Sequence, residues 1–369
     1  MLPYLVLAAV VPAVMGIGEA VRRLFALERR RDPQDPVPAE GTSPWTYFDL
    51  VALATLVVFS ALRFGIGTDY DTYALIYGRV DTEDWAREIA TAPQELGFTL
   101  LLLIVKTVDP TPTTFFWVTS ILTVVPAFVA IRQVSARPVL GVLLYVLFAF
   151  YLTPFNLVRQ GIAVSLLFWA TTCLRRRPVL FVVVAVVAAS IHSSAVIALA
   201  VMWVSHRWRP TPWTVGLILA GAVVGLVGLD RFSALGDLVA RLNPRYESYL
   251  SASGAGVGTY LQIVLFLALL VYASVLGRHQ SHGVTARTAW MTTFVLIGVA
   301  FMIVSTQAIP FGRLAPYFTI YLVLLLPDRV AASRNPVAHD VALATGGAAF
   351  YAFHLAFYGG LIPYQTYFS

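Results

Sequence analysis

The chain contains repeated apolar runs, most of them long enough to cross a membrane as a helix. A helix of about twenty residues spans the hydrocarbon core, which is about 30 Å thick, and the runs recur from residue 2 to residue 358. Only 12% of the residues are charged, compared with about 25% in a typical soluble domain. The runs are continuous and do not alternate, so they do not indicate a β-barrel. We therefore predict an all-α polytopic membrane protein that forms a single integral membrane domain over residues 1–369.

Hydropathy predicts about twelve transmembrane helices. They are expected near residues 2–20, 46–63, 113–132, 138–153, 156–174, 178–190, 193–205, 212–229, 258–277, 288–306, 311–327 and 338–358. The N-terminal run lacks a basic leading region and a cleavage site, so we expect it to be a retained helix and not a removed signal peptide. The apolar run 96–108 would make a helix of only about 18 Å, so we predict a re-entrant or interfacial helix there.

The distribution of arginine predicts the orientation. Cytoplasmic loops are enriched in Lys and Arg, and the arginine-rich connections fall on one side only if segment 96–108 does not cross the membrane. Residues 21–45 are then a cytoplasmic loop, and 64–112 and 230–257 are outer loops. The start of the second outer loop has helical apolar spacing and is expected to lie on the membrane surface.

The same orientation makes the stretch VLFVVVAVVAASIHSSAVIALAVMWV a broken hairpin, with His192 at its outer bend. One long tilted helix over 178–204 is the alternative. A short or broken helix is tolerated where it lines a cavity enclosed by protein. His192 titrates near neutral pH in its unperturbed state, so at such a bend it would suit proton transfer. A structural histidine is the other interpretation.

Two arginines are expected within the membrane near its outer face. Arg159 and Gln160 lie about one turn into an apolar helix, and Arg313 lies among helix-breaking residues in TQAIPFGRLAPYF. A charged side chain within the membrane is a functional-site hypothesis by default, although Arg159 could instead extend its guanidinium to the headgroups. Buried Gln160 needs hydrogen-bond partners.

Further arginines are predicted on the same face. Arg63 ends the second apolar run, and Arg245 accompanies Tyr246 and Tyr249 in the second outer loop. Guanidinium groups match phosphate oxygens in a bidentate geometry and keep their charge, so these residues suggest an anionic ligand with phosphate groups. The nearby aromatic side chains could stack on sugar rings or form the aromatic belt of the membrane interface.

Two carboxylates are candidates in the first outer loop. Asp69 begins DYD, a weak match to the DxD pattern that binds a divalent ion with a nucleotide sugar. Because nucleotide sugars are cytosolic and this loop is predicted outside, we favour Asp69 as a proton acceptor or a ligand of a sugar hydroxyl. Glu95 opens the apolar run in TAPQELGF, where capping of a helix N-terminus is an equally good explanation.

Several kinds of site are not predicted. The single cysteine, Cys173, excludes a disulfide within the chain and a cysteine metal site. The sequence lacks the nucleotide-binding loop, the zinc-protease motif and the serine-hydrolase motif. We expect no metal, no cofactor and no nucleic-acid partner.

Six segments in order resemble the EpsG family of exopolysaccharide polymerases, which are related to Wzy-type O-antigen polymerases. The segments are RFGIGTDYDTY, PQELGFTLLL, FNLVRQGIAVSLLFWA, SIHSSAVIAL, RYESYL and FGRLAPYFTIYLVLLLP, and they span roughly residues 45–330. The resemblance implies a GT-C-like glycosyltransferase of the bacterial cytoplasmic (inner) membrane. Such an enzyme joins polyprenyl-diphosphate-linked oligosaccharide repeat units at the outer face, with undecaprenyl diphosphate as the carrier.

The resemblance also implies a site. Its residues would be Arg63, Asp69, Tyr70, Arg159, Gln160, His192 and Arg313, covered by the second outer loop with Tyr246 and Tyr249. Arg159, His192, Asp69 and Arg313 would be catalytic, and the others, together with Arg245 and Glu95, would bind substrate. Membrane lipid and other polysaccharide assembly proteins are the further expected partners.

Two alternatives act on the same class of lipid-linked saccharide. One is a transferase that resembles an O-antigen ligase or adds a single sugar. Ligases usually carry a larger outer loop than 230–257. The other is a transporter or flippase, for which we find no inverted repeat in the sequence.

Overall fold

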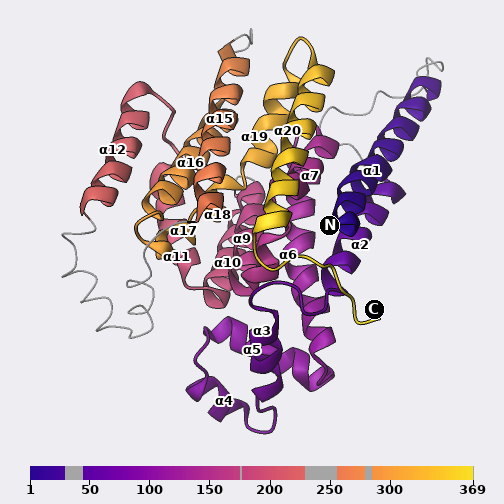
Figure 1. The fold of residues 1–369 in the computed structure, drawn as a ribbon, viewed down its shortest axis with the longest axis vertical. Coiled ribbons are helices and arrows are strands. Elements are labelled where there is room, and N and C mark those ends of the chain that lie inside the picture. Colours follow the sequence, from indigo (N-terminus) through magenta and orange to yellow (C-terminus); the bar gives the residue numbers. More distant parts are fainter. Residues whose placement is uncertain (30–44, 175–176, 229–255, 279–284, 369) are drawn as a thin grey trace.

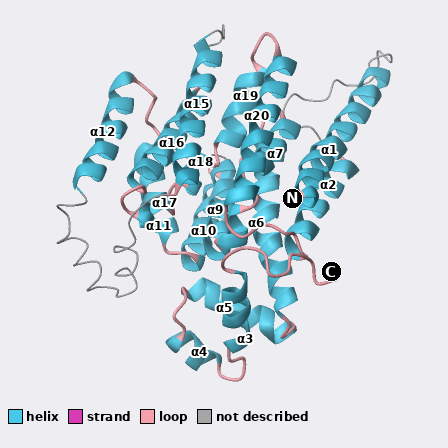
Figure 2. Ribbon diagram, in the orientation of Figure 1, coloured by secondary structure: helices cyan, strands magenta, loops and turns pink. Residues whose placement is uncertain are grey.

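The computed structural model describes residues 1–29, 45–174, 177–228, 256–278 and 285–368. In these ranges the chain forms helices joined by loops (Figure 2), with one isolated β-bridge between Arg63 and Thr366 and no strand. The helices are α1 (Leu2–Arg29), α2 (Tyr47–Ala61), α3 (Tyr70–Arg79), α4 (Trp85–Thr91), α5 (Leu96–Val108), α6 (Pro112–Val134), α7 (Pro138–Leu147), α8 (Thr153–Asn156), α9 (Val158–Cys173), α10 (Pro178–Ile191), α11 (Ser194–Ser205), α12 (Pro212–Gly228), α15 (Val257–Arg278), α16 (Ala286–Val304), α17 (Ile309–Gly312), α18 (Pro316–Thr319), α19 (Leu322–Ala331) and α20 (Pro336–Phe357).

The apolar runs of the sequence form these helices, which confirms the all-α membrane protein. Among the described residues, 5 helical segments are long and apolar enough to cross a membrane: Leu2–Phe25, Pro112–Val134, Val257–Gly277, Ala286–Val304 and Ile309–Ala331. Six further apolar helices have 10–17 residues. The predicted cytoplasmic loop 21–45 begins later than expected, because α1 continues to Arg29.

Local sequence explains where several helices begin. Proline occupies the first turn of α6, α7, α10 and α20, where a missing N–H costs nothing because no helical acceptor precedes it. Thr46 and Asp49 cap the start of α2 reciprocally: the Thr46 hydroxyl accepts from the Asp49 N–H, and the Asp49 carboxylate accepts from the Thr46 N–H. These starts fix which residues stand at the ends of the bundle.

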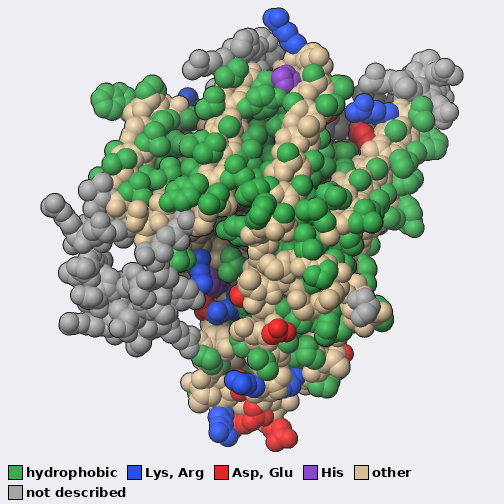
Figure 3. All heavy atoms as spheres, in the orientation of Figure 1, with side chains coloured by type: hydrophobic (Ala, Val, Ile, Leu, Met, Phe, Trp, Pro, Cys, Tyr) green, Lys and Arg blue, Asp and Glu red, His purple; other side chains and the backbone are tan. Residues whose placement is uncertain are grey.

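The long helices lie side by side in one body (Figure 1). Helix α6 packs against α2 and α9, α10 packs against α9, α12 lies beside α16, and α1 contacts α2 and α7. Apolar side chains cover most of the visible face of this body (Figure 3). The short helices α3, α4 and α5 form a separate layer at one end, which we call the α3–α5 layer.

The opposite end of the bundle gathers arginine-bearing connections. Arg287 Nη2 lies 3.0 Å from Asp328 Oδ2, and the Ala136 N–H donates to Asp328 Oδ1 over 3.0 Å. Arg137 pairs with Asp340. These contacts bring the α6–α7 connection, the start of α16 and the α19–α20 region together, as the charge argument predicts. We call this the arginine-rich end; its cytoplasmic orientation remains a prediction from the charge bias.

The end of the bundle that carries the α3–α5 layer contains a short helix and a helix break, both at positions that the sequence predicted. Helix α5 covers Leu96–Val108 and lies in the α3–α5 layer instead of running alongside the long helices (Figure 1). The chain also breaks at His192, which has an extended backbone (φ −149, ψ 118) between α10 and α11. The predicted break at this histidine is therefore confirmed.

Candidate functional site

The start of α5 lies against the break between α10 and α11. Glu95 is the residue before α5, and His192 and Ser193 connect the two halves of the broken segment. Gly97 permits this approach, because a Cβ atom there would lie 2.2 Å from Ser190 Oγ and 2.8 Å from the Ser190 carbonyl carbon. A glycine in the first turn of α5 thus brings the Glu95 carboxylate to the end of α10.

Glu95 is the centre of a cluster of polar contacts. Its Oε2 accepts a hydrogen bond from Arg159 Nη1 over 2.5 Å. Its Oε1 accepts from the Ser193 backbone N–H over 3.1 Å and from the Ser193 hydroxyl over 3.2 Å. His192 Nδ1 lies 3.3 Å from the same Oε1. We call Glu95, Arg159, His192 and Ser193 the Glu95 cluster.

This environment keeps Glu95 ionised. Burial alone would raise the pKa of the carboxyl, but the contacts with His192, Arg159 and the Ser193 N–H hold the pKa well below its usual range. The carboxylate is therefore a fixed negative charge beside the imidazole, and it is not itself suited to accept a proton near neutral pH.

His192 presents one ring nitrogen to Glu95 and leaves the other uncommitted. The residue is 8% exposed, and its buried Nε2 has no hydrogen-bond partner among the residues that the structure describes. The 3.3 Å separation at Nδ1 is an ion-pair distance without hydrogen-bond alignment. Catalytic contacts are often loose before substrate binds. A buried polar atom without a partner is costly, so Nε2 marks a position where a ligand group would be stabilised.

Arg159 is held by contacts from three directions and does not extend freely to the headgroups. It is the second residue of α9, and its side chain is 29% exposed. It pairs with Glu95, lies near Tyr73 and places its Cζ 5.7 Å from the centre of the Phe98 ring. Its guanidinium therefore has a defined position next to the imidazole of His192.

Gln160 ties the Glu95 cluster to the broken helix segment near Arg313. Its Nε2 donates to the Arg313 carbonyl oxygen over 2.7 Å, while its Oε1 is buried without a partner. Arg313 lies between α17 and α18 and is half-buried. The Ser194 hydroxyl lies 3.1 Å from the Tyr317 hydroxyl, a second link between the break and this segment. The structure thus brings the backbone of Arg313 next to Gln160.

Arg63 and Tyr70 belong to a neighbouring aromatic cluster. The Arg63 guanidinium is 2% exposed, lies 4.5 Å from the Phe155 ring centre and 5.0 Å from the Phe116 ring centre, and donates to the Ser60 carbonyl over 2.5 Å. Tyr70 stacks on Phe116 with ring centres 4.3 Å apart. These contacts suit a structural role for Arg63, whereas the resemblance implies that it binds substrate.

The other predicted site residues are placed as follows. Asp69 precedes α3 without capping it, and its carboxylate accepts from the Thr68 hydroxyl over 3.3 Å. Arg245, Tyr246, Tyr249 and the predicted surface helix lie outside the described residues.

The sequence did not predict that the C-terminal segment contacts the end of the bundle that carries the α3–α5 layer. The Phe64 N–H donates to the Gln365 carbonyl over 3.0 Å, and the hydroxyl groups of Tyr70 and Tyr367 are hydrogen-bonded. The nearest signal was three aromatic residues in the short tail LIPYQTYFS. Asn156 was also missed; its Oδ1 accepts from the Thr68 N–H over 2.8 Å.

The turn held by Asn156 requires glycine. Gly67 has φ +98, and a Cβ atom there would lie 2.3 Å from the Phe155 carbonyl oxygen. The positive φ and the close backbone approach both exclude a larger residue. This turn sets the start of α3, which carries Tyr73, a neighbour of Arg159.

Within the described residues, no three His, Cys, Asp or Glu side chains gather closely enough to hold a metal ion. The Glu95 cluster itself offers a carboxylate, an imidazole, a guanidinium and the Ser193 hydroxyl. Figure 3 shows basic, acidic and histidine side chains at the boundary between the apolar body and the α3–α5 layer.

The comparisons with known proteins agree with the resemblance seen in the sequence. No curated protein and no solved structure matches the chain. Residues 46–366 match the EpsG family, a range that includes the Glu95 cluster, the broken segment near Arg313 and the C-terminal segment as far as Thr366. The match covers most of the chain, and so this membrane protein belongs to the EpsG family, which indicates a role related to exopolysaccharide.

Proposed function

We infer that the protein is a membrane glycosyltransferase that polymerises saccharide repeat units carried on a polyprenyl diphosphate, with undecaprenyl diphosphate as the expected carrier. The observation that carries the proposal is the Glu95 cluster: an imidazole with one uncommitted nitrogen beside a fixed guanidinium, at a break in the helical bundle. Membership of the EpsG family supports the exopolysaccharide context.

In the proposed reaction, an acceptor hydroxyl attacks the anomeric carbon of the donor saccharide. The new glycosidic C–O bond forms as the bond from the anomeric carbon to the diphosphate oxygen breaks, and the polyprenyl diphosphate leaves. The uncommitted Nε2 of His192 takes the hydroxyl proton, and Nδ1 faces the Glu95 carboxylate. The carboxylate orients the ring and stabilises the imidazolium that forms, as in other acid–base pairs of this kind.

Charge also develops on the leaving diphosphate. Arg159 and Arg313 are the proposed groups that stabilise this charge, because a preorganised guanidinium binds phosphate oxygens strongly where water is excluded. Arg159 would share its guanidinium between Glu95 and the diphosphate. The two guanidinium groups would perform the task that a divalent ion performs in other transferases, so we propose that the reaction is independent of metal.

The arrangement in the membrane is part of the same proposal. The shorter apolar helices would complete about twelve crossings in a GT-C-like fold in the bacterial cytoplasmic membrane, with the Glu95 cluster facing outward. Loop 64–112 and loop 230–257 would be the outer loops, and Arg245, Tyr246 and Tyr249 would cover the bound saccharide. Asp69 would bind a sugar hydroxyl near the entrance.

The test is to delete the gene in its native strain and to complement it with the wild-type chain or with His192→Ala. Wild-type protein should restore a ladder of repeat units, and His192→Ala at equal membrane abundance should leave single lipid-linked units. His206→Ala is the control, because His206 is half-buried and its ring bonds the neighbouring Trp203 carbonyl. A full ladder with His192→Ala would contradict the proposed base.

The same strains separate polymerisation from the alternatives. A deletion that leaves single units accessible at the outer face supports a polymerase, because the lipid-linked unit has already crossed. Units trapped on the inner face would support a flippase instead. Full-length polymer that accumulates on the carrier lipid would support a ligase. Chelation of divalent ions during polymerisation in isolated membranes should leave the rate unchanged.

A further inference from the structure

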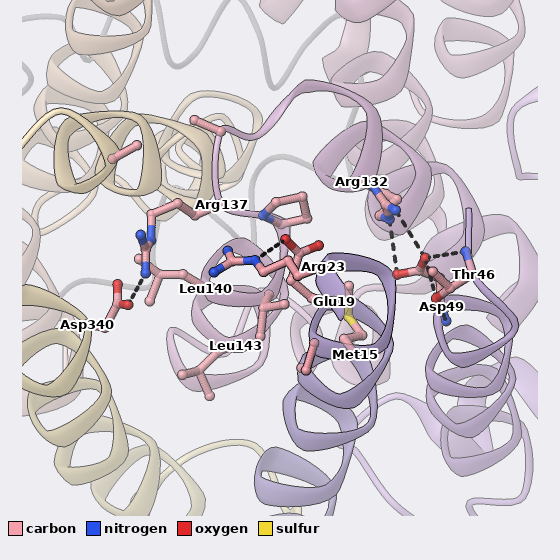
Figure 4. A pocket seen from close by; sticks show the side chains of 16 residues that line it. Met15, Glu19, Arg23, Thr46, Asp49, Arg132, Arg137, Leu140, Leu143 and Asp340 are labelled. Atoms are coloured by element: carbon pink, nitrogen blue, oxygen red, sulfur yellow. Dashed lines mark hydrogen bonds and ion pairs between the residues drawn. The ribbon is translucent and has the colours of Figure 1, made fainter. Parts of the chain in front are cut away.

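A pocket of about 480 Å³ lies at the arginine-rich end, far along the bundle from the Glu95 cluster. Helices α1 and α7 form its two long walls, and the ends of α2, α6, α19 and α20 complete it (Figure 4). Its volume lies within the range of about 300–1,000 Å³ that is typical of ligand sites. Helix α1 precedes the residues that match the family, which begin at 46. The pocket is therefore formed between this helix and residues that match the family.

Both long walls change from apolar to charged in the same direction. On α1, Met15, Glu19 and Arg23 line the pocket at intervals of four residues, so they share one face of the helix. On the other wall, Leu140 of α7 lines the pocket, and Arg137 precedes the helix. The pocket therefore has an apolar inner part and a charged rim towards the end of the bundle.

The rim carries both signs of charge. Arg23 Nε lies 3.0 Å from Glu19 Oε1, the neighbouring Arg22 pairs with Glu19 Oε2, and Arg137 pairs with Asp340. The side chains of Glu19, Arg137 and Asp340 are each between 29% and 30% exposed, and that of Arg23 is 74% exposed. Figure 4 shows the Arg23–Glu19 pair and the Arg137–Asp340 pair along the same pocket. These groups remain accessible to a ligand.

A third ion pair, between Arg132 and Asp49, is buried and has little capacity to bind a ligand. Arg132 Nε lies 3.0 Å from Asp49 Oδ1, and both side chains are 5% exposed. The Asp49 carboxylate also caps α2 through Thr46. This pair forms the closed wall of the pocket, and the Glu19, Arg23, Arg137 and Asp340 side chains form the part that can respond to a ligand.

We propose that this pocket binds one phospholipid whose headgroup carries both a phosphate and a primary ammonium, as in phosphatidylethanolamine. The phosphate would lie between Arg23 and Arg137, because guanidinium groups bind phosphate oxygens in a bidentate way. The ammonium donates up to three hydrogen bonds, which suit the carboxylates of Glu19 and Asp340. An acyl chain would occupy the apolar part beside Met15, Leu140 and Leu143.

The balance of charge distinguishes this ligand from other lipids. An anionic headgroup would satisfy the arginines but would lie against two carboxylates with no cation to offer them, which is unfavourable. A choline headgroup carries a positive charge but no N–H donor. The amino-phospholipid supplies both partners, and so it is the headgroup that matches the rim.

The empty space beside Gly16 allows a direct test. A Cβ atom at Gly16 meets nothing within 4 Å, although the residue lines the pocket. Gly16→Met should therefore fold and place its side chain in the hollow. Gly346→Met is the matched control, because a Cβ atom at Gly346 also meets nothing within 4 Å and this glycine of α20 is absent from the lining.

The measurement is the thermal midpoint of the purified, delipidated protein in detergent with added dioleoyl lipids. Phosphatidylethanolamine should raise Tm of the wild-type chain and of Gly346→Met by about 3 °C or more. Phosphatidylcholine and phosphatidylglycerol should raise it by less than half as much. Gly16→Met should lose the selective response. Equal responses to the three lipids, or an undiminished response in Gly16→Met, would overturn the proposal.

A change of charge tests the assignment of the two partners. Glu19→Gln with Asp340→Asn removes the groups that face the ammonium, so phosphatidylglycerol should become at least as effective as phosphatidylethanolamine. Asp81→Asn with Glu83→Gln is the charge-matched control in an exposed loop, and it should keep the wild-type preference. Native mass spectrometry of the wild-type chain gives an independent measurement, in which one phosphatidylethanolamine should be retained. A preference of the wild-type chain for phosphatidylglycerol would contradict the model of a zwitterionic headgroup.

Discussion

Gly97 of α5 packs directly against Ser190 of α10, two residues before the break at His192. A Cβ atom on Gly97 would lie 2.8 Å from Ser190 Cβ and 2.8 Å from the Ser190 carbonyl carbon. Because one of these neighbours is backbone, α10 cannot accommodate a side chain by a rotamer change alone. This contact sets the distance between the Glu95 carboxylate and the His192 imidazole.

The first prediction follows from this contact. Gly97→Val should separate α5 from α10, because the added atoms would overlap the backbone of α10. We expect loss of polymer and a lower Tm, equivalent to about 1–3 kcal/mol of destabilisation. Gly78→Val in α3 is the control, since a Cβ atom there meets nothing within 4 Å. Normal polymer from Gly97→Val would show that the spacing of the two helices is unimportant.

The second prediction separates the roles of His192 and Glu95. His192→Ala should reduce the polymerisation rate by about 10²–10⁴-fold, which is the usual effect of losing a general base. Glu95→Gln keeps the shape but removes the charge that stabilises the imidazolium, so it should cause a smaller loss. The measurement is the rate of polymer formation in isolated membranes. A larger loss in Glu95→Gln than in His192→Ala would assign the base to the carboxylate.

The third prediction concerns stability against pH. The pKa of folded Glu95 lies below the unfolded value of about 4.3, so the unfolded state binds more protons in acid. The stabilisation from the ionised carboxylate should be fully present above about pH 5 and should be lost as the pH falls below about 4 towards the folded pKa.

The corresponding measurement compares Tm of His192→Ala with that of the double variant Glu95→Gln/His192→Ala. Using this background removes the titration of the imidazole from the comparison. The difference in Tm should be constant from pH 8 to about pH 5 and should shrink at lower pH. A difference that grows as the pH falls would have the wrong sign for a carboxyl with a lowered pKa.

The fourth prediction tests whether Arg63 is structural. Its guanidinium is 2% exposed and lies between the rings of Phe116 and Phe155. Arg63→Ala would leave a cavity and remove the bond to the Ser60 carbonyl, at a cost of about 2–5 kcal/mol. The expected result is a reduced amount of folded protein with normal activity per folded molecule. Arg79→Ala, at an exposed position, should change neither the amount of folded protein nor its activity. Normal abundance of Arg63→Ala with lost activity would instead indicate that Arg63 binds substrate.

The positions of the helices could be predicted from the sequence because apolar runs and prolines are local signals. The break at His192 and the place of α5 were also predictable, because the arginine distribution constrains how often the chain crosses. The Glu95–Arg159 contact was not predictable. Its two residues are separated by 64 positions, and a carboxylate before a helix is equally well explained by capping.

Arg63 shows the limit of reasoning from residue type. Its sequence position, at the end of an apolar run, suits either an outer cavity or the headgroup region. The aromatic rings around it come from α6 and from the residues before α9, and no local pattern connects these segments with residue 63. The contacts of the C-terminal tail were not predictable for the same reason: Tyr367 bonds Tyr70, which lies 297 positions away along the chain.

The pairing of the C-terminal tail with residues 63–70 has a practical consequence. The Phe64 N–H bonds the Gln365 carbonyl, and the Tyr70 hydroxyl bonds Tyr367, so the last residues leave the bundle beside the α3–α5 layer. A reporter enzyme fused after residue 369 would therefore occupy the same compartment as Glu95 and His192. Alkaline phosphatase matures only where its disulfides can form, so its activity in such a fusion would identify the side of the membrane on which new glycosidic bonds are made.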